Sequence, residues 1–255
     1  MREALRVERL SRAFGALRAL NDVSFEVEQG ERRAIIGPNG AGKTTLFNLV
    51  AGEVTATSGQ VFLHGREISR LPAFRRCEIG LARTYQRNNL FVGLSTRENV
   101  SLAVRRRLGA ASQPFHSAER LPAVADETQG ILERFGLEAR ADLPVRALGY
   151  GEQRRLEVAL AVASGPSVLL LDEPTAGMSP SETAHMTALI RELPRSITVL
   201  IIEHDMDVVF ALADRISVLH FGELLAEGPP REVRANPAVQ EAYLGGAAEA
   251  APVHV

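Results

Sequence analysis

Two stretches near the start of the chain alternate apolar and polar residues with the period of a strand. They cover Leu5–Leu10 and Val23–Val27. Successive side chains of a strand point to opposite faces, so this alternation predicts strands that bury one face and expose the other. One-sided burial is typical of antiparallel sheets, and the sequence therefore predicts an antiparallel β part near the N-terminus.

Four later stretches are short and mainly apolar, as strands buried on both faces are. They are Arg33–Ile36, Val168–Leu171, Ile197–Ile202 and Ile216–Leu219. Arg33–Ile36 continues into glycines, and helical patterns follow the next two stretches. Buried strands that alternate with helices predict an α/β fold with a mainly parallel central sheet.

The middle of the chain has a different pattern. From about Leu90 to Ser164 helical segments predominate, with a polar loop at Ser112–Ser117. We predict a single domain over residues 1–245, with residues 1–89 and 165–245 as its α/β core and 90–164 as an inserted helical subdomain. The Ala-rich end, residues 246–255, is expected to be disordered.

Composition and charge narrow the class of protein. The chain has 255 residues, of which 45% are hydrophobic and 24% charged, as in ordinary soluble domains. Its formal net charge of −2 gives no broad attraction to nucleic acid. The longest uncharged stretch, Val158–Leu171, is too short to cross a bilayer, and no export leader is evident. The single cysteine, Cys77, excludes an intrachain disulfide and fits a reducing compartment.

The strongest chemical signal is GPNGAGKTT, which follows a predicted strand and opens a predicted helix. That context is the one a phosphate-binding loop (P-loop) needs, because backbone N–H groups then surround the phosphates of a nucleotide. Lys43 would reach the β- and γ-phosphates, and the Thr44 hydroxyl would coordinate Mg²⁺. A glycine-rich turn with a chance lysine is the alternative, which the strand–helix context disfavours. The predicted nucleotide-binding residues are Gly37, Pro38, Asn39, Gly40, Ala41, Gly42, Lys43, Thr44 and Thr45.

The second signal is VLLLDEP, Val168–Pro174, in which a buried strand ends in two carboxylates. Ligands of open α/β folds bind at the carboxyl ends of the strands. Asp172 can hold Mg²⁺, and Glu173 can polarise a water molecule that attacks the γ-phosphate. Solvated acids at a strand end are the alternative, which is less favoured beside a P-loop.

The third signal, LGYGE, precedes a helix and has the small residues of an anion site. The helix pattern rests on Leu156, Leu160 and Ala163, spaced three to four apart. The stretch Leu148–Ala161 contains no lysine or threonine that could neutralise a triphosphate or hold a metal. The stretch therefore has the backbone features of a phosphate site without the side chains that would complete one.

Taken in order, the P-loop, Gln86, LGYGE, Asp172-Glu173 and His204 resemble the nucleotide-binding subunit of an ATP-binding-cassette (ABC) transporter. The resemblance spans nearly the whole chain. Within that family, the segments ARTYQ, YGEQRRLE, IIEHDMDVV and AYLG are most similar to the subunits that power branched-chain amino-acid importers.

The resemblance implies roles for the remaining residues. Phe14 would stack on adenine, Gln86 would contact the metal or the attacking water, and His204 would bond the γ-phosphate. In the family the signature sequence of one subunit caps the ATP of the other, in a head-to-tail dimer, and the segment Ala176–Pro180 touches the opposite subunit. The capping residues would be Leu148, Gly149, Tyr150, Gly151 and Glu152.

The signature departs from the common Leu-Ser-Gly-Gly-Gln. Gly149 lacks the serine hydroxyl that would bond the γ-phosphate, and Glu152 adds a negative charge nearby. The backbone donors and the helix end are expected to remain. Closure over the capped ATP is expected to be weaker without being lost, since a hydrogen bond to a charged group contributes about 1.5–3 kcal/mol.

The resemblance also implies cofactors and partners. ATP and Mg²⁺ are the cofactors, and ATP-driven dimer closure and hydrolysis would power transmembrane permease subunits. The second ATPase subunit is expected to be a different chain, with a homodimer left open, and a solute-binding protein takes part indirectly. No nucleic-acid partner is expected. The chain would lie at the cytoplasmic face of the cell membrane, held by the permeases.

Two other functions stay open. One is an ABC-type ATPase of another transporter branch or of a non-transport process such as DNA repair, translation or cofactor assembly. The chain lacks a long coiled-coil insertion, a second cassette and a basic face, which disfavours that hypothesis. The other is a nucleotide-gated regulator without hydrolysis, which the presence of Lys43, Asp172, Glu173 and His204 disfavours. The Asn-Lys-x-Asp pattern of GTPases is absent.

Overall fold

The structure is a computed structural model, which describes residues 2–84, 90–109 and 122–248. The chain divides into two compact units, one formed by residues 1–76 and 194–255 and the other by Cys77–Leu193. The second unit extends beyond the predicted helical subdomain 90–164 on both sides. The predicted polar loop Ser112–Ser117 lies outside the described residues. Within the described ranges, no helix is long and apolar enough to cross a membrane.

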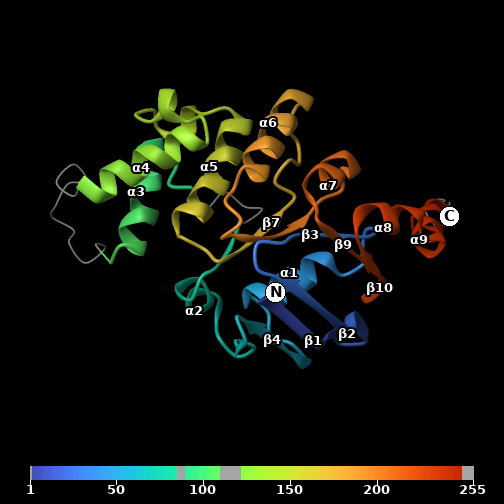
Figure 1. Cartoon of the computed structure of the whole chain (residues 1–255). Helices are drawn as coiled ribbons and strands as arrows, with labels where there is room; N and C mark the ends of the chain where they lie inside the picture. The colour runs from blue at the N-terminus through green and yellow to red at the C-terminus, as the bar shows by residue number, and fades with distance from the viewer. Residues whose placement is uncertain (1, 85–89, 110–121, 249–255) are drawn as a thin grey trace. The chain divides into compact units, whose positions relative to one another are not determined.

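The first unit contains an antiparallel sheet with the strand order β2-β1-β4-β5 (Figure 1). Its strands are β1 (Glu3–Phe14), β2 (Leu17–Glu28), β4 (Ser58–Leu63) and β5 (Arg66–Glu67). Val7 and Leu10 of β1 and Val23 of β2 are buried, while Glu8, Asp22 and Ser24 lie outside the core. The predicted antiparallel β part is confirmed.

The same unit contains the buried strands β3 (Arg32–Ile36), β8 (Thr198–Ile202), β9 (Arg215–His220) and β10 (Glu223–Gly228), in the order β10-β9-β3-β8. β3 runs parallel to both β8 and β9, and β10 is antiparallel to β9. Every residue of β3 and β8 is buried, which confirms the mainly parallel sheet. The helices of this part are α1 (Lys43–Ala51), α2 (Ala73–Glu78, at the boundary of the unit), α7 (Met206–Leu212), α8 (Pro230–Ala235) and α9 (Pro237–Ala248).

Helix α9 extends beyond the predicted end of the folded domain. Residues 246–248, expected to be disordered, belong to this helix. Val239 and Ala242 are buried, and α9 contacts α8 and β10. A helix fixed by tertiary contacts adds one hydrogen bond for each further residue that joins it.

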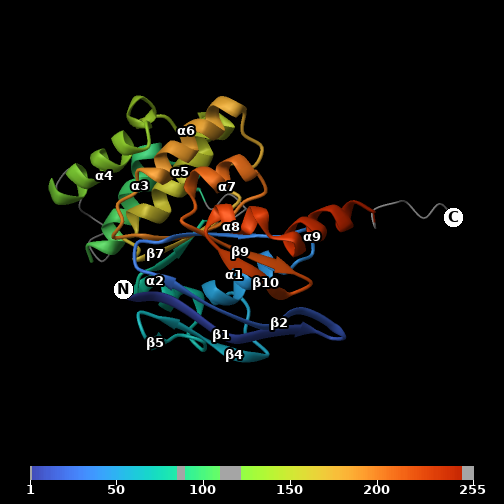
Figure 2. The same cartoon turned by 45° about the vertical axis from the view of Figure 1, so that its right-hand side comes forward.

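The second unit combines two parallel strands, β6 (Leu81–Arg83) and β7 (Val168–Asp172), with helices. The helices are α3 (Thr96–Arg107), α4 (Pro122–Arg134), α5 (Tyr150–Ala163), α6 (Pro180–Arg191) and the short turns η3 (Glu138–Arg140) and η4 (Val145–Ala147). α3 contacts α4 and α5, and Figure 2 shows these helices together in green and yellow. The prediction that helices predominate between Leu90 and Ser164 is confirmed.

Serine–glutamate pairs begin two of these helices. Ser95 caps α3 and Ser179 caps α6; each accepts from the backbone N–H of a glutamate, Glu98 or Glu182, whose carboxylate accepts the serine N–H in return. Such capping boxes satisfy N–H groups that a helix leaves without internal partners.

Candidate functional site

The turn between β3 and α1 is the P-loop, and its glycines are required for different reasons. At Gly37, φ is 152° and a side chain would collide with the Leu219 carbonyl oxygen. At Gly42, φ is 99° and a Cβ atom would lie 2.6 Å from the Ala19 carbonyl oxygen. Gly40 also has a positive φ, 79°, but a Cβ there would meet nothing within 4 Å. The backbone therefore curls through three glycines with positive φ and leaves open space at Gly40.

Lys43 is held inside this loop. Its ammonium donates to the carbonyl oxygens of Gly37 at 2.6 Å and Pro38 at 2.9 Å, and the residue is only 6% exposed. It is also the only lysine in the sequence. Thr44 is exposed and Thr45 half-buried in the first turn of α1, where backbone N–H groups lack helical acceptors. A charged amine and a helix N-terminus thus meet in one loop, which suits a phosphate group.

Tyr243 of α9 is a further contact of the P-loop. Its phenol oxygen accepts a hydrogen bond from the Gly37 N–H. Burial raises the pKa of the Tyr243 phenol above its usual value, and the bond from Gly37 opposes that rise. We did not predict this residue as part of the site, although it lies in the AYLG segment that carried the family resemblance.

Two more predicted nucleotide contacts lie in the first unit. His204 is exposed two residues after the end of β8, and the next residue, Asp205, caps α7. Phe14 ends β1 and is 47% exposed, with the guanidinium carbon of Arg12 4.4 Å from its ring centroid. The Phe14 ring thus keeps accessible surface for stacking. Gln86 lies outside the described residues.

Asp172, at the end of β7, forms a buried ion pair in the second unit. Arg83 of the parallel strand β6 donates from Nη2 to Asp172 Oδ2 at 2.7 Å, and the two side chains are 6% and 0% exposed. Arg83 was missed by the sequence analysis, although a charge in a short buried strand was a signal. A buried carboxylate needs a partner, and Arg83 supplies it.

The second carboxylate oxygen of Asp172 fits a metal ligand. Asp172 Oδ1 is buried and has no hydrogen-bond partner among the described residues. Mg²⁺ prefers oxygen ligands and binds proteins through one or two carboxylates together with phosphate oxygens. The next residue, Glu173, is half-buried with a φ of 48°, unusual outside glycine. Asp172 is therefore suited to hold a cation, and the turn that follows it carries Glu173 in a sparsely populated backbone conformation.

The signature stretch begins α5, and its departures from the common sequence have structural consequences. Gly149 precedes the helix in an extended conformation, with φ −64° and ψ 162°. Glu152 accepts the Gly149 N–H at 2.9 Å and the Arg140 Nε at 2.8 Å. The bond from Arg140 is the main reason why the pKa of Glu152 lies below its usual value. The charge of Glu152 is thus compensated within the chain, and one backbone donor expected to face a phosphate is already used.

Other signature residues are fixed by packing. Leu148 is buried, and Gly151 is buried against α6, where a side chain would collide with the Glu182 carboxylate. Tyr150 is 50% exposed. These contacts place the start of α5 against α6 within the second unit.

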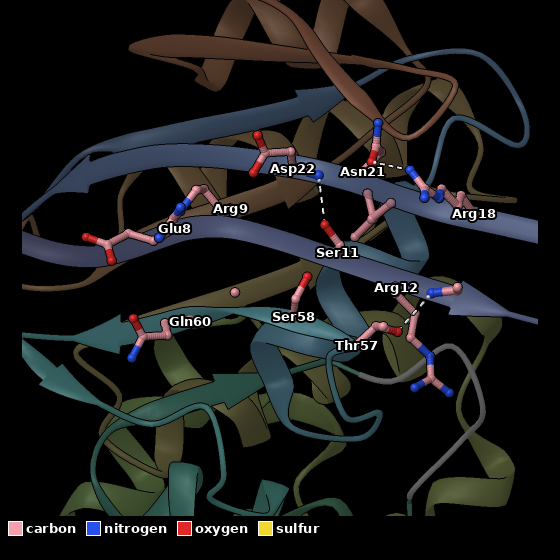
Figure 3. A pocket seen from close by; sticks show the side chains of 13 residues that line it. Glu8, Arg9, Ser11, Arg12, Arg18, Asn21, Asp22, Thr57, Ser58 and Gln60 are labelled. Atoms are coloured by element: carbon pink, nitrogen blue, oxygen red, sulfur yellow. Dashed lines mark hydrogen bonds between the residues drawn. The ribbon is translucent and has the colours of Figure 1, made fainter.

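A separate hollow of about 640 Å³ lies on the antiparallel sheet (Figure 3). Its described lining residues come from β1, β2 and the β4 region, with no residue of the P-loop among them. Figure 3 shows polar groups of this lining paired with one another, as when Ser11 accepts the Asp22 N–H at 2.9 Å. It is distinct from the predicted nucleotide site.

The sequence matches known families in two places. Residues 20–176 match the ABC transporter family, and residues 223–249 match the family of the branched-chain amino acid ATP-binding cassette transporter. The chain is 41% identical over 251 residues to the high-affinity branched-chain amino acid transport ATP-binding protein LivG of Salmonella typhimurium, covering 95% of this chain and 98% of LivG. It is 40% identical over 255 residues to BraF of Pseudomonas aeruginosa, a protein with the same description, covering 96% and 99%.

Solved structures agree with these matches. The ADP conformation of MJ1267, an ATP-binding cassette of an ABC transporter, has a TM-score of 0.84 at 29% identity and covers 96% of this chain and 100% of MJ1267. The dimeric post-hydrolysis state of the ATP-binding cassette MJ0796, bound to ADP and Pi, has a TM-score of 0.75 at 25% identity, covering 89% and 99%. The chain therefore belongs to the ABC transporter family, as its ATP-binding cassette.

Proposed function

We propose that this chain hydrolyses ATP to drive import of branched-chain or related amino acids through transmembrane permeases. The observation that carries ATP binding is the P-loop, where the only lysine is held by two backbone carbonyls at the start of α1. The class of solute is supported by the names of LivG and BraF and by the match over residues 223–249.

In this proposal the residues divide the chemistry between them. Lys43 and the amides of the P-loop bind the β- and γ-phosphates. Thr44 and Asp172 would hold Mg²⁺, which would neutralise phosphate charge. Glu173 orients the attacking water, and His204 donates to the γ-phosphate. Gln86 contacts the metal or the water. Phe14 stacks on adenine.

The proposed assembly is a dimer bound to two permease subunits at the cytoplasmic face of the membrane. Leu148–Glu152 of this chain cap the ATP of the second ATPase subunit, which we propose is a different chain. A solute-binding protein delivers the amino acid outside. A pull-down from detergent-solubilised membranes tests this assembly: permeases and a second ATPase should co-purify, and recovery of soluble assembly or nucleic-acid factors alone would contradict it.

Hydrolysis and binding can be separated with Glu173→Gln, which keeps the size of the side chain and removes its charge. Turnover should fall at least about 100-fold, the lower end of general acid–base contributions, while ATP binding persists. Because Lys43 is the only lysine, ¹⁵N-lysine labelling gives one side-chain signal that reports ATP binding. Near-normal turnover in the partner-bound variant would remove Glu173 from its role.

The solute is tested by uptake in cells that lack the gene. The wild-type chain should restore uptake of labelled leucine, isoleucine or valine, and Glu173→Gln should not. Uptake of an unrelated sugar serves as the control. If the purified chain hydrolyses ATP but uptake of all three amino acids is unchanged, the proposed solute class is wrong and the ATPase assignment stands.

A further inference from the structure

Tyr150 occupies a position where the common signature has glycine, and its side chain contacts the segment around Ala176. The hydroxyl donates to the Ala176 carbonyl oxygen at 2.9 Å. The Tyr150 hydroxyl oxygen in turn accepts a hydrogen bond from Arg154 Nε at 3.0 Å, and Arg154 is itself paired with Glu157 at 2.8 Å. The phenol is therefore oriented by one donor and one acceptor, although the residue is 50% exposed.

The other end of this contact lies next to Glu173. The Ala176 N–H donates to the Glu173 carbonyl oxygen at 3.2 Å, so both residues belong to one turn. Glu173 has a φ of 48°, a conformation that disfavours residues with a Cβ atom and that neighbouring contacts must maintain. Tyr150 supplies such a contact through Ala176.

The ring of Tyr150 also lies against this segment. A Cβ atom built on Gly177 would be 3.2 Å from the Tyr150 hydroxyl oxygen and 3.3 Å from the nearest ring carbon. Gly177 has a φ of 75°. The turn thus approaches the tyrosine so closely that little more than a glycine fits between them.

We propose that Tyr150 is a positioning residue that couples the signature to the turn carrying Glu173 in the same subunit. The inference rests on the proposed function, in which the signature of a subunit caps its partner's ATP while Glu173 acts on the subunit's own ATP. Through Tyr150 and Ala176, the segment that caps the partner's ATP also holds the turn that carries the water-activating carboxylate of the other site. The two sites of the dimer are then linked within one chain.

The contact predicts a specific kinetic effect. Tyr150→Phe removes the hydroxyl and keeps the ring, so kcat for ATP hydrolysis on the permeases should fall about two- to tenfold, as expected for one hydrogen bond. KM for ATP should stay within about twofold, because no phosphate contact is lost. Thr187→Val is the matched control, since Thr187 also donates one hydroxyl to a backbone carbonyl, that of Thr183 in α6. It should leave kcat unchanged.

Two further measurements separate coupling from capping and from general stability. ATP-driven dimer closure in a Glu173→Gln background should be the same with and without Tyr150→Phe. Hydrogen exchange of the backbone amides between Asp172 and Ser179 in the closed dimer should be faster in Tyr150→Phe and unchanged in Thr187→Val.

If dimer closure weakens together with kcat, Tyr150 acts on the capped ATP and the proposal is overturned. Unchanged kcat and unchanged exchange overturn it as well. A wild-type chain without ATPase activity on its permeases would defeat the proposed function, while the exchange comparison would still test the contact.

Discussion

Helices α1 and α5 both begin after a glycine, yet the two glycines differ in what their backbone requires. Gly42, before α1, has a φ of 99°, and a Cβ atom built on it would lie only 2.6 Å from the Ala19 carbonyl oxygen. Gly149, before α5, is extended, and a Cβ atom there would meet only Glu152 Oε2, at 3.7 Å. Any residue can adopt the conformation of Gly149, whereas that of Gly42 favours glycine strongly.

The difference separates two kinds of sequence motif. The P-loop binds phosphate through the course of its backbone, so its glycines are fixed by steric limits. The start of α5 resembles the capping boxes at Ser95 and Ser179 with glycine in place of serine, because Glu152 already accepts the Gly149 N–H. A departure from the common signature at this position therefore changes the available hydrogen bonds and leaves the fold intact.

Alanine at the two glycines should give the largest difference. Gly42→Ala is expected to lower the free energy of unfolding by about 2–4 kcal/mol, because it combines an unfavourable φ with overpacking. Gly149→Ala should lower it by less than about 1 kcal/mol, the effect of a poorer helix cap. Urea unfolding of both variants measures the values, and equal losses would contradict the comparison.

The next largest effect is expected on the affinity for ATP, when one cationic side chain near the start of each helix is removed. Lys43→Ala is expected to weaken ATP binding about 10- to 100-fold, since it removes hydrogen bonds to charged phosphate oxygens. Arg140→Ala, near α5, should leave the affinity of the isolated monomer within about twofold, because the signature caps only a partner's nucleotide. Calorimetric titration with ATP measures both; unchanged affinity in Lys43→Ala would refute its assigned role.

Serine at Gly149 should have a smaller effect and in the stabilising direction. Gly149→Ser supplies a hydroxyl to the γ-phosphate of the partner's ATP, which should tighten ATP-driven closure about two- to tenfold. The extended backbone of Gly149 accepts the side chain without strain. Closure is measured in the Glu173→Gln background, with Gly149→Ala as the control that adds only a methyl group. If serine and alanine behave alike, the hydroxyl is not what limits this site.

The smallest expected effect concerns the charge of Glu152. Its pKa lies below the ordinary 4.5, chiefly because Arg140 donates to the carboxylate. A lowered pKa in the folded state means that the stabilisation is present above pH 4.5 and is lost as the pH falls through the folded value. The advantage of the wild type over Glu152→Gln should therefore be a few tenths of a kcal/mol at neutral pH, as for exposed pairs, and should disappear in acid. Unfolding curves of both proteins at several pH values test this prediction. A stability difference that grows as the pH falls would contradict it.

Much of the fold could be predicted from the sequence because the signals are local. The alternation around Val7 and Val23 predicted the antiparallel strands, and the apolar runs at Arg33–Ile36 and Val168–Leu171 predicted the buried ones. The P-loop could be predicted equally well, since its glycines, Lys43 and Thr44 lie within a few residues of one another in the sequence. Helix α9 continues to Ala248, past the predicted boundary at residue 245, because composition indicates propensity only, while the buried contacts of Val239 and Ala242 anchor the helix.

The remaining features depend on residues that only folding brings together. Arg83 pairs with Asp172 across 89 positions, and Tyr150 donates to Ala176 across 26. No local pattern encodes such partners, because side-chain hydrogen bonds depend on the spacing of whole elements. The sequence alone predicted the P-loop chemistry and determined the family, since both rest on short-range order. Only the tertiary structure decided that Gly42 is obligatory and Gly149 replaceable. Gly42 has a positive φ and lies against the backbone of Ala19, which is distant in the sequence, whereas Gly149 is extended and has space for a side chain.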